Sequence, residues 1–359
     1  MGSKHPYYYV SSSTAISSQY TEHAFLRRLN AVNNGGVSGR LVWMQLYRGQ
    51  RISSLILERE QSRKEFLTND LSLWYEVKIH LLSPLLQSTF SKSSIDLETE
   101  QFLGNSFAIS GSMCLQIYYA FMSTILSSFL SKTSINGLLN RGKMFLFSTS
   151  QLRSFLDIPA DWTSADKQLL DLGAGDGGIT TKLSPFYGTI YTTEMSQIMQ
   201  WRLRQQNFQE EDVEKWSSTS RRYNLISALN LLDRHYNPRK LLSDLHDLAL
   251  QSNCYVLMAV VLPVHQYVEF RPSNAESRNA RLKVSGNSFE QHASSLVENE
   301  FIPAGFEVVK WTKLPYLCEG DLNKPYYLLD DALFLLRPVP TDAQRVTSQN
   351  DSAIVHNEL

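Results

Sequence analysis

This sequence has few cysteines and no excess of either sign of charge. Both features exclude some classes of protein. The 359 residues include three cysteines, Cys114, Cys254 and Cys318, which lie far apart. They form neither a disulfide framework nor the spacing of a zinc site, so we expect no metal centre and thiols packed as small apolar groups. The formal net charge is −1. With no basic stripe, a nucleic acid is not favoured as a partner.

Long apolar runs are missing as well. Residues 1–24 are rich in serine and tyrosine, and no apolar core of a secretory signal is recognisable there, which favours a cytoplasmic protein. The final residues, His356 to Leu359, resemble the H-D-E-L retention signal, a likeness that we attribute to chance.

The stretch 101–131 contains no charged residue. It is too polar for a membrane span, which needs about 20 mostly apolar residues. Its apolar residues recur every three or four positions, which predicts a buried amphipathic helix. A helix lying on a membrane surface is the alternative.

Composition divides the chain into four segments. Residues 1–70 are expected to form a poorly ordered or accessory segment and residues 341–359 a disordered tail. Residues 71–150 form a helical cap in this interpretation, with one helix from Leu71 to Phe90. Residues 151–340 form the main domain.

Strands and helices alternate in that main domain. The expected strands are Gln168–Leu172, Thr189–Thr193, Tyr223–Leu229, Tyr255–Leu262, Glu307–Leu314 and Tyr327–Leu336. Alternation of this kind predicts a Rossmann-like, doubly wound parallel sheet. The last two strands are joined without a helix-length apolar segment, so we expect one of them to run antiparallel. Asn237-Pro238 marks one helix start, and Ser288 with Gln291 predicts a capping box at another.

A glycine-rich run follows the first of these strands. Asp171, Gly173, Gly175, Asp176 and Gly177 lie between the strand and a short helix. Glycines there let the backbone turn sharply and approach a ligand closely. The pattern suits the adenosine cofactor site of class I methyltransferases, although a dinucleotide site and a plain structural turn are alternatives.

Acidic and amide side chains follow the next two strands. Glu194 is placed to accept hydrogen bonds from ribose hydroxyls, or to be a solvated acid at a helix start. Asn230 and Asp233 are three residues apart, a spacing that lets both face one pocket and hold a nitrogen heterocycle by its N–H. Alternatively, Asp233 caps a helix or pairs with Arg234.

The connection between the last two strands is rich in tyrosine. We expect a long loop over residues 314–321, which includes Tyr316 and is followed by Tyr326 and Tyr327. Long connections are often functional, so these rings are candidates to contact a substrate. Packing at the rim of the domain is the alternative.

From about Trp74 to Pro338 the sequence resembles the DREV family, also called the methyltransferase-like protein nine family, of protein-histidine methyltransferases. The matching strings are Thr133 to Leu139, Arg141-Gly142, Met144-Phe145, Phe147-Ser148, Leu170 to Gly177, Thr193-Glu194, Leu229 to Arg234, Leu262-Pro263, His265, Tyr267 to Glu269, Leu314 to Asp321, Tyr326-Tyr327 and Leu329 to Ala332. Residues 1–73 have no counterpart that we recognise.

This resemblance implies a class I methyltransferase fold that uses S-adenosyl-L-methionine and methylates the pros (Nδ1) nitrogen of histidine in His-x-His motifs of protein substrates. It places Asp171, Gly173 and Glu194 at the cofactor. It places Asn230, Asp233 and Tyr327 at the target imidazole, with Tyr316 lining the same pocket.

Further expectations concern assembly, the cap and location. We expect a monomer in which residues 101–131 and 134–148 pack over the cofactor edge. An endomembrane or mitochondrial location stays open. The chain contains no His-x-His of its own. A class I methyltransferase for a small molecule and a non-catalytic cofactor-binding scaffold are the rival functions.

Overall fold

The computed structural model describes residues 70–268 and 281–340, together with the separate helical residues 57, 61, 64 and 68. Contacts divide the chain into two compact units, residues 1–64 and 65–359. The sheet and the helices packed on it belong to the second unit. The tail 341–359 and most of the segment 1–70, which we expect to be poorly ordered or accessory, lie outside the described residues. The domain boundaries proposed from the sequence stay predictions.

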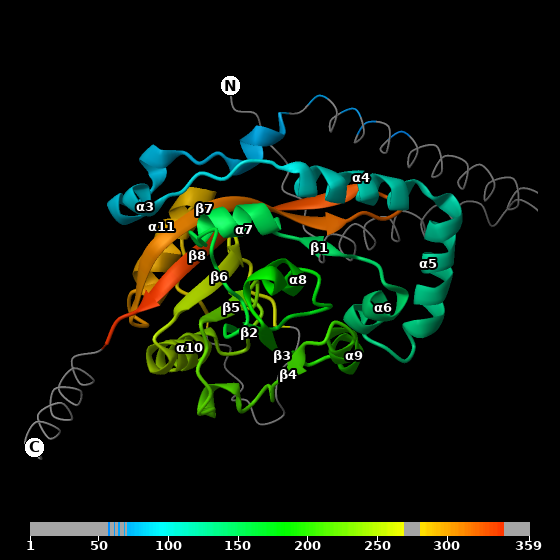
Figure 1. The fold of residues 1–359 in the computed structure, drawn as a ribbon. Coiled ribbons are helices and arrows are strands. Elements are labelled where there is room, and N and C mark those ends of the chain that lie inside the picture. The colour runs from blue at the N-terminus through cyan, green and yellow to red at the C-terminus, as the bar shows by residue number, and fades with distance from the viewer. Residues whose placement is uncertain are drawn as a thin grey trace, which may run out of the picture. The chain divides into compact units, whose positions relative to one another are not determined.

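One sheet organises the described part of the second unit (Figure 1). Its strand order is β1-β7-β8-β6-β5-β2-β3-β4. The strands are β1 (Met144–Phe145), β2 (Gln168–Leu172), β3 (Thr189–Thr193), β4 (Gln209–Glu210), β5 (Leu225–Leu229), β6 (Tyr255–Val261), β7 (Phe306–Glu319) and β8 (Tyr326–Pro338).

Strand direction confirms the expected sheet. Strands β2, β3, β4, β5 and β6 pair in parallel, and β8 runs antiparallel to both β6 and β7. The short β1 is also antiparallel to β7. The sequence indicated neither β1 nor the short β4. The chain leaves β2 for β3 on one side and returns to β5 on the other. Ligands bind at such a reversal of strand order, beyond the carboxyl ends of the strands.

The helical segments are of uneven length. They are η1 (Leu71–Tyr75), η2 (Ile79–Leu81), α3 (Pro84–Thr89), α4 (Leu97–Gly111), α5 (Met113–Leu126), α6 (Lys132–Leu139), α7 (Thr149–Phe155), α8 (Thr180–Leu183), η3 (Ser184–Phe186), α9 (Gln197–Gln205), η4 (Trp216–Ser218), α10 (Pro238–Ser252), α11 (Phe289–Leu296) and the π-helical η5 (Val297–Phe301).

Helices cover both faces of the sheet, each over its own core. On one face Leu170, Ile226 and Met258 pack with the apolar residues of α10 and α11. On the other face Leu169 and Leu225 pack with residues of α7, α8 and α9. Successive strand residues point to opposite faces, so a strand buried on both sides needs an almost continuous apolar run. The doubly wound arrangement predicted from the sequence is therefore present.

Helix α10 shows the local signals that the sequence predicts. The Asn237 side chain accepts a hydrogen bond from the Lys240 N–H, and Pro238 is the first helical residue. At α11 the Ser288 side chain accepts from the Gln291 N–H, but Gln291 Oε1 accepts from the Asn287 N–H instead. The expected reciprocal capping box at Ser288 is therefore only half formed.

The helix expected over Leu71–Phe90 is wrong. The segment forms η1, η2 and α3, separated by extended residues. Proline disfavours helical backbone in the residue before it and starts a helix well. Ser83 is accordingly extended and Pro84 begins α3.

The single buried helix expected within residues 101–131 is also wrong. The chain forms α4 and α5, which meet at Ser112 with a bend of 77°. Helix α5 exposes Ile117, Tyr118 and Phe121 by at least half of their surface. In the described ranges no single helix is long and apolar enough to cross a membrane, and α4 and α5 meet that criterion only as a bent pair. The membrane-surface alternative stays a prediction.

The loop expected over residues 314–321 is a strand for most of its length. Strand β7 continues to Glu319 and pairs with β8 from Tyr326 onward. The cysteines also differ from expectation in part, since Cys254 is buried but Cys114 is exposed.

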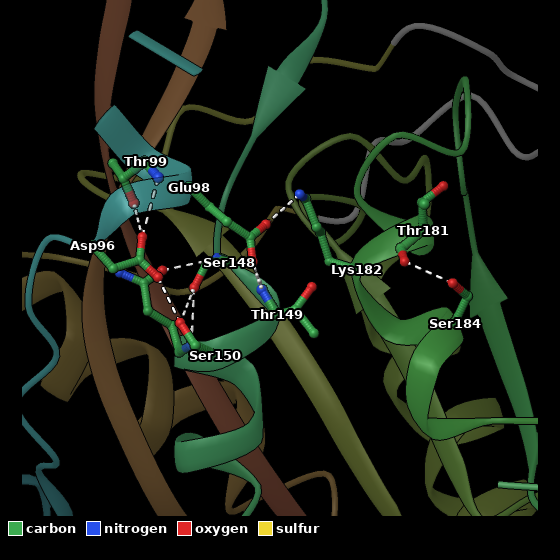
Figure 2. A network of polar contacts seen from close by, with 10 residues as sticks. Asp96, Glu98, Thr99, Ser148, Thr149, Ser150, Thr181, Lys182 and Ser184 are labelled. Atoms are coloured by element: carbon green, nitrogen blue, oxygen red, sulfur yellow. Dashed lines mark hydrogen bonds and ion pairs between the residues drawn. The ribbon is translucent and has the colours of Figure 1, made fainter. Parts of the chain in front are cut away.

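A polar network joins the cap to the sheet (Figure 2). Glu98 of α4 accepts a hydrogen bond of 3.1 Å from the Thr149 N–H and pairs with the Lys182 ammonium of α8 at 2.5 Å. Asp96 accepts from the Ser150 hydroxyl at 2.6 Å. These contacts hold the first turn of α4 against α7 and α8.

Candidate active site

The glycine-rich loop leaves β2 in left-handed backbone conformations. Gly173, Gly175 and Gly177 have φ values of 70°, 59° and 80°, which side chains with a Cβ rarely adopt. A Cβ on Gly175 would meet open space, whereas one on Gly177 would lie 2.6 Å from the Gln206 amide. Gly175 therefore keeps the loop open toward a ligand, and Gly177 lets it pack against α9.

Asp171, near the end of β2, fixes the start of this loop by hydrogen bonds. Its carboxylate accepts hydrogen bonds of 2.6 Å from the hydroxyls of Thr180 and Ser227. Burial raises the pKa of Asp171 to about 6, although both hydroxyls favour the charged form. Asp171 thus ties the end of β2 to α8 and β5.

Glu194 braces the same loop from β3. Its two oxygens accept hydrogen bonds of 3.0 Å from the Gly175 N–H and 2.8 Å from the Ser196 N–H. Asp176 is held locally, since its Oδ1 accepts from the Gly178 N–H. These hydrogen bonds, all between groups of the protein, hold the backbone of the loop in place.

A cavity of about 790 Å³ lies over these strand ends. Most of the predicted site residues line it, namely Asp171, Gly173, Gly175, Asp176, Glu194, Asn230 and Tyr316. Gly177, Asp233 and Tyr327 are not in its wall. The wall also contains Asn136 and Arg141, as expected if residues 134–148 cover the cofactor edge, but it contains no residue of 101–131.

Asn230 occupies a strained position at the end of β5. Its φ is 55°, a left-handed conformation that asparagine tolerates better than most residues. Its backbone N–H donates to the Ala259 carbonyl at 2.9 Å, and its side-chain Nδ2 donates to Asp331 Oδ2 at 2.7 Å. Asn230 is therefore held by β6 and β8 together.

Three acceptor oxygens beside this position lack a hydrogen-bond partner among the residues that the structure describes. They are Asn230 Oδ1, Asp233 Oδ1 and Asp331 Oδ1. None of the three residues exposes more than 7% of its surface. Buried polar atoms without partners are rare in native proteins and each calls for an explanation.

Both carboxyls of this group are shifted toward their protonated forms. Burial raises the pKa of Asp233 to about 6 against the opposing charge of Arg234. Burial raises the pKa of Asp331 to about 8, and the nearby Asp233 adds to that rise while Asn230 opposes it. Asp233 does not cap α10, because Asn237 does.

The two predicted tyrosines are placed differently. Tyr316 on β7 is buried, and its hydroxyl donates to the sulfur of Met144 at 2.6 Å. Tyr327 on β8 donates to Asp321 Oδ2 at 3.0 Å, within the hairpin that joins β7 to β8. In this arrangement the Tyr327 hydroxyl is engaged by the hairpin, and its contact with a substrate stays a prediction.

Asp331 is the buried group that sequence reasoning missed. The signal was a carboxyl inside the apolar strand expected at Tyr327–Leu336. Adjacent Asp330 obscured it, because either residue could have been the one facing solvent. The structure separates them: Asp330 pairs with Lys313 at 3.0 Å and is partly exposed, while Asp331 is fully buried.

The cavity has the features that S-adenosylmethionine requires. Gly175 leaves space that a Cβ would otherwise enter, Glu194 presents a carboxylate at the end of β3, and the volume accommodates a nucleoside with its side chain. The order of the sheet, with its reversed strand β8, and the glycine-rich loop define a class I S-adenosylmethionine-dependent methyltransferase.

The family within that class is also clear. The sequence profile described as DREV methyltransferase matches residues 74–338, and the chain belongs to this family. The match covers both the sheet and most of the helical cap. S-adenosylmethionine is therefore its cofactor.

Several solved structures are similar at low identity. A putative RNA methyltransferase of Pyrococcus horikoshii is 12% identical over 62% of this chain and 98% of that chain, with a TM-score of 0.36. A putative methyltransferase of Bacillus halodurans C-125 is 13% identical over 53% and 100% of the two chains, with a TM-score of 0.34. Magnesium protoporphyrin IX methyltransferase of Synechocystis PCC 6803, with bound SAH, is 13% identical over 53% and 81%, with a TM-score of 0.33. The class assignment rests on strand order and family membership.

Proposed function

We propose that this methyltransferase acts on proteins and methylates the pros (Nδ1) nitrogen of histidine in His-x-His motifs, giving 1-methylhistidine. One structural observation supports this proposal in addition to the family resemblance. Two buried acceptor oxygens, Asn230 Oδ1 and Asp233 Oδ1, have no hydrogen-bond partner among the described residues, and Asn230 lines the cavity at the end of β5.

The chemistry of those oxygens favours an imidazole. Leaving a buried acceptor unpaired costs about 1–3 kcal/mol, which a ligand with hydrogen-bond donors recovers. Neutral imidazole carries one N–H donor and one bare nitrogen, and the methylated ring is a cation. The buried carboxylate of Asp233 favours a ligand that gains positive charge and disfavours an anion.

The reaction does not need a strong general base. When bound, S-adenosylmethionine supplies a methyl group on a positively charged sulfur. Histidine has an ordinary pKa near 6.5, so its ring is mostly neutral at pH 7. The protein has to choose the tautomer and orient the ring.

Asp233 is the residue that we assign to tautomer choice. Its carboxylate accepts the N–H of the far ring nitrogen, Nε2, which leaves the lone pair of Nδ1 free for attack. The same negative charge stabilises the cation that forms, as a carboxylate does for other imidazolium ions. Asn230 Oδ1 shares the same Nε2 N–H as a second acceptor, which limits rotation of the ring, and Tyr316 closes the pocket.

The test compares acceptors of matched chemistry. We expect methyl transfer to a His-Ala-His peptide at a rate at least tenfold above that to Ala-Ala-His and far above that to free histidine. Equal rates on the peptides and free histidine would favour a methyltransferase for small molecules. Cofactor binding with transfer to none of these acceptors would contradict the proposed substrate.

A further inference from the structure

The buried carboxyl of Asp331 has no role in the function proposed so far. It lies at the centre of the sheet, where β8 pairs with Val261 of β6 and with Leu314 of β7. None of its surface is exposed. A carboxyl at such a place is costly unless its contacts offset the loss of hydration.

A hydrogen bond joins this side chain to Asn230. Asn230 Nδ2 donates to Asp331 Oδ2 at 2.7 Å across 101 residues of sequence. The bond consumes the donor end of the amide, while its acceptor end, Oδ1, has no partner among the described residues. An amide rotated by half a turn would present N–H groups instead and would repel an imidazole N–H.

We propose that Asp331 is a positioning residue that acts through Asn230: its acceptor oxygen fixes the amide so that the Asn230 carbonyl, not its NH₂ group, is available to the substrate ring. This proposal rests on the proposed histidine function. Asp331 itself does not touch the substrate.

The charge state of Asp331 fits this role. Its pKa is raised to about 8, so at pH 7 the carboxyl keeps its proton. Because Oδ2 accepts from Asn230, that proton lies on Oδ1. A neutral acid and a carboxamide then present the same acceptor to Asn230, which makes Asp331→Asn a conservative change.

The test is a double-mutant cycle on the full chain with a His-Ala-His peptide. Asp331→Leu removes the acceptor, and we expect kcat to fall by about 10- to 100-fold with the cofactor Kd unchanged. Asp331→Asn should retain kcat within about threefold. In an Asn230→Ala background, Asp331→Leu should cause no further loss, because the group through which it acts is gone.

Adjacent Asp330 provides the matched control. It occupies the same strand, with its side chain paired to Lys313, so Asp330→Leu should leave kcat within about threefold. Loss of kcat in Asp331→Asn as large as in Asp331→Leu would overturn the proposal. So would an equal further loss from Asp331→Leu in the Asn230→Ala background.

A reciprocal exchange covers the case in which Asp331→Leu does not fold. Asn230→Asp removes the amide N–H that donates to Asp331 and should lower kcat, and adding Asp331→Asn restores one donor and one acceptor. We expect at least tenfold recovery, and no recovery would overturn the proposal. A wild-type protein that does not methylate the peptide would contradict the proposed function itself, and with it the role of Asp331.

Discussion

At the scale of single residues, the ionisation of Asp233 decides whether the pocket can hold an imidazole in the required tautomer. Burial alone favours the protonated acid, and the nearby Arg234 charge limits the rise, leaving a pKa of about 6. Asp233 is therefore mostly ionised at pH 7. A buried carboxyl whose pKa is shifted toward neutral pH is typical of functional sites.

Replacing Asp233 with asparagine tests that role. Asparagine keeps the shape and one acceptor oxygen but removes the charge that stabilises the methylated ring. We expect kcat on a His-Ala-His peptide to fall by roughly 10² or more, while the Kd of the cofactor, measured by calorimetry, changes little. Near-full activity in Asp233→Asn would show that the charge has no part in the reaction.

Gly173 tests the cofactor end of the cavity. Its φ of 70° disfavours any side chain, and a Cβ there would lie 3.1 Å from Leu231 Cδ1. Arginine at this position is strained and crowds Leu231, which lines the cavity together with Gly173. We expect Gly173→Arg to abolish binding of S-adenosylmethionine in a calorimetric titration without unfolding the protein, as judged by circular dichroism. Unchanged affinity would place the cofactor elsewhere.

The sequence predicts most of the residues that line the cavity, but it misses the buried Asp331. Asp171 lies at the end of a strand, and Glu194 and Asn230 each follow a strand, whose apolar run is easily recognised, so their meeting at one edge of the sheet follows from the fold class. Asp331 could not be placed in the same way. Its contact with Asn230 depends on which strand lies beside β6 and on the register of β8, and neither is encoded locally.

At the scale of elements, the cap shows where hydrophobic periodicity misleads. The spacing of apolar residues in 101–131 fits one helix, but the chain turns at Ser112 and the apolar residues of α5 face outward. Periodicity reports which residues share a helix face and does not report whether that face is covered. The segment 71–90 likewise contains the apolar residues of a helix, but extended residues interrupt it and divide it into η1, η2 and α3.

The start of α7 is stabilised by a full capping box. Ser148 accepts from the Gln151 N–H, and the Gln151 side chain accepts from the Ser148 N–H. We expect Ser148→Ala to lower the free energy of unfolding by about 1 kcal/mol, the usual contribution of an N-cap hydroxyl. Urea denaturation measures it. The matched control is Ser154→Ala, an exposed serine of the same helix, which should change the free energy by less than about 0.5 kcal/mol. Equal effects of the two changes would contradict the capping role.

At the scale of the whole molecule, three buried carboxyls link stability to pH. Asp171, Asp233 and Asp331 all have pKa values in the folded protein above the ordinary 3.8. The folded state therefore binds more protons than the unfolded state between about pH 4 and pH 6, and up to about pH 8 for Asp331. Stability falls with rising pH wherever the folded state binds more protons.

Comparison with Asp331→Asn isolates the highest of these shifts. We expect the free energy of unfolding of the wild type to fall more steeply between pH 6 and pH 8 than that of Asp331→Asn, which cannot ionise at this position. Urea denaturation at several pH values measures both slopes. Asp330→Asn should keep the wild-type slope. Parallel curves for the wild type and Asp331→Asn would show that Asp331 is already ionised at pH 6.

The overall architecture is the level at which sequence reasoning works best. Two strands, Gln168–Leu172 and Thr189–Thr193, have the bounds expected for them, and the other four expected strands differ at their ends, whereas the two-residue strands β1 and β4 were not expected. Buried parallel strands have a strong local signal, which explains this accuracy. The extension of β7 to Glu319 was missed because Pro315, Gly320 and Asp321 resemble a loop in sequence, whereas pairing with β8 keeps the chain extended through Glu319.

The central claim is that the acceptor is Nδ1 of a histidine in a protein. The most direct measurement incubates the full chain with S-adenosylmethionine and a His-Ala-His peptide and locates the methyl group on the ring by fragmentation mass spectrometry against 1-methyl and 3-methyl standards. The account predicts a single methyl group on Nδ1. A methyl group on Nε2, or no transfer while cofactor binding is intact, would contradict it.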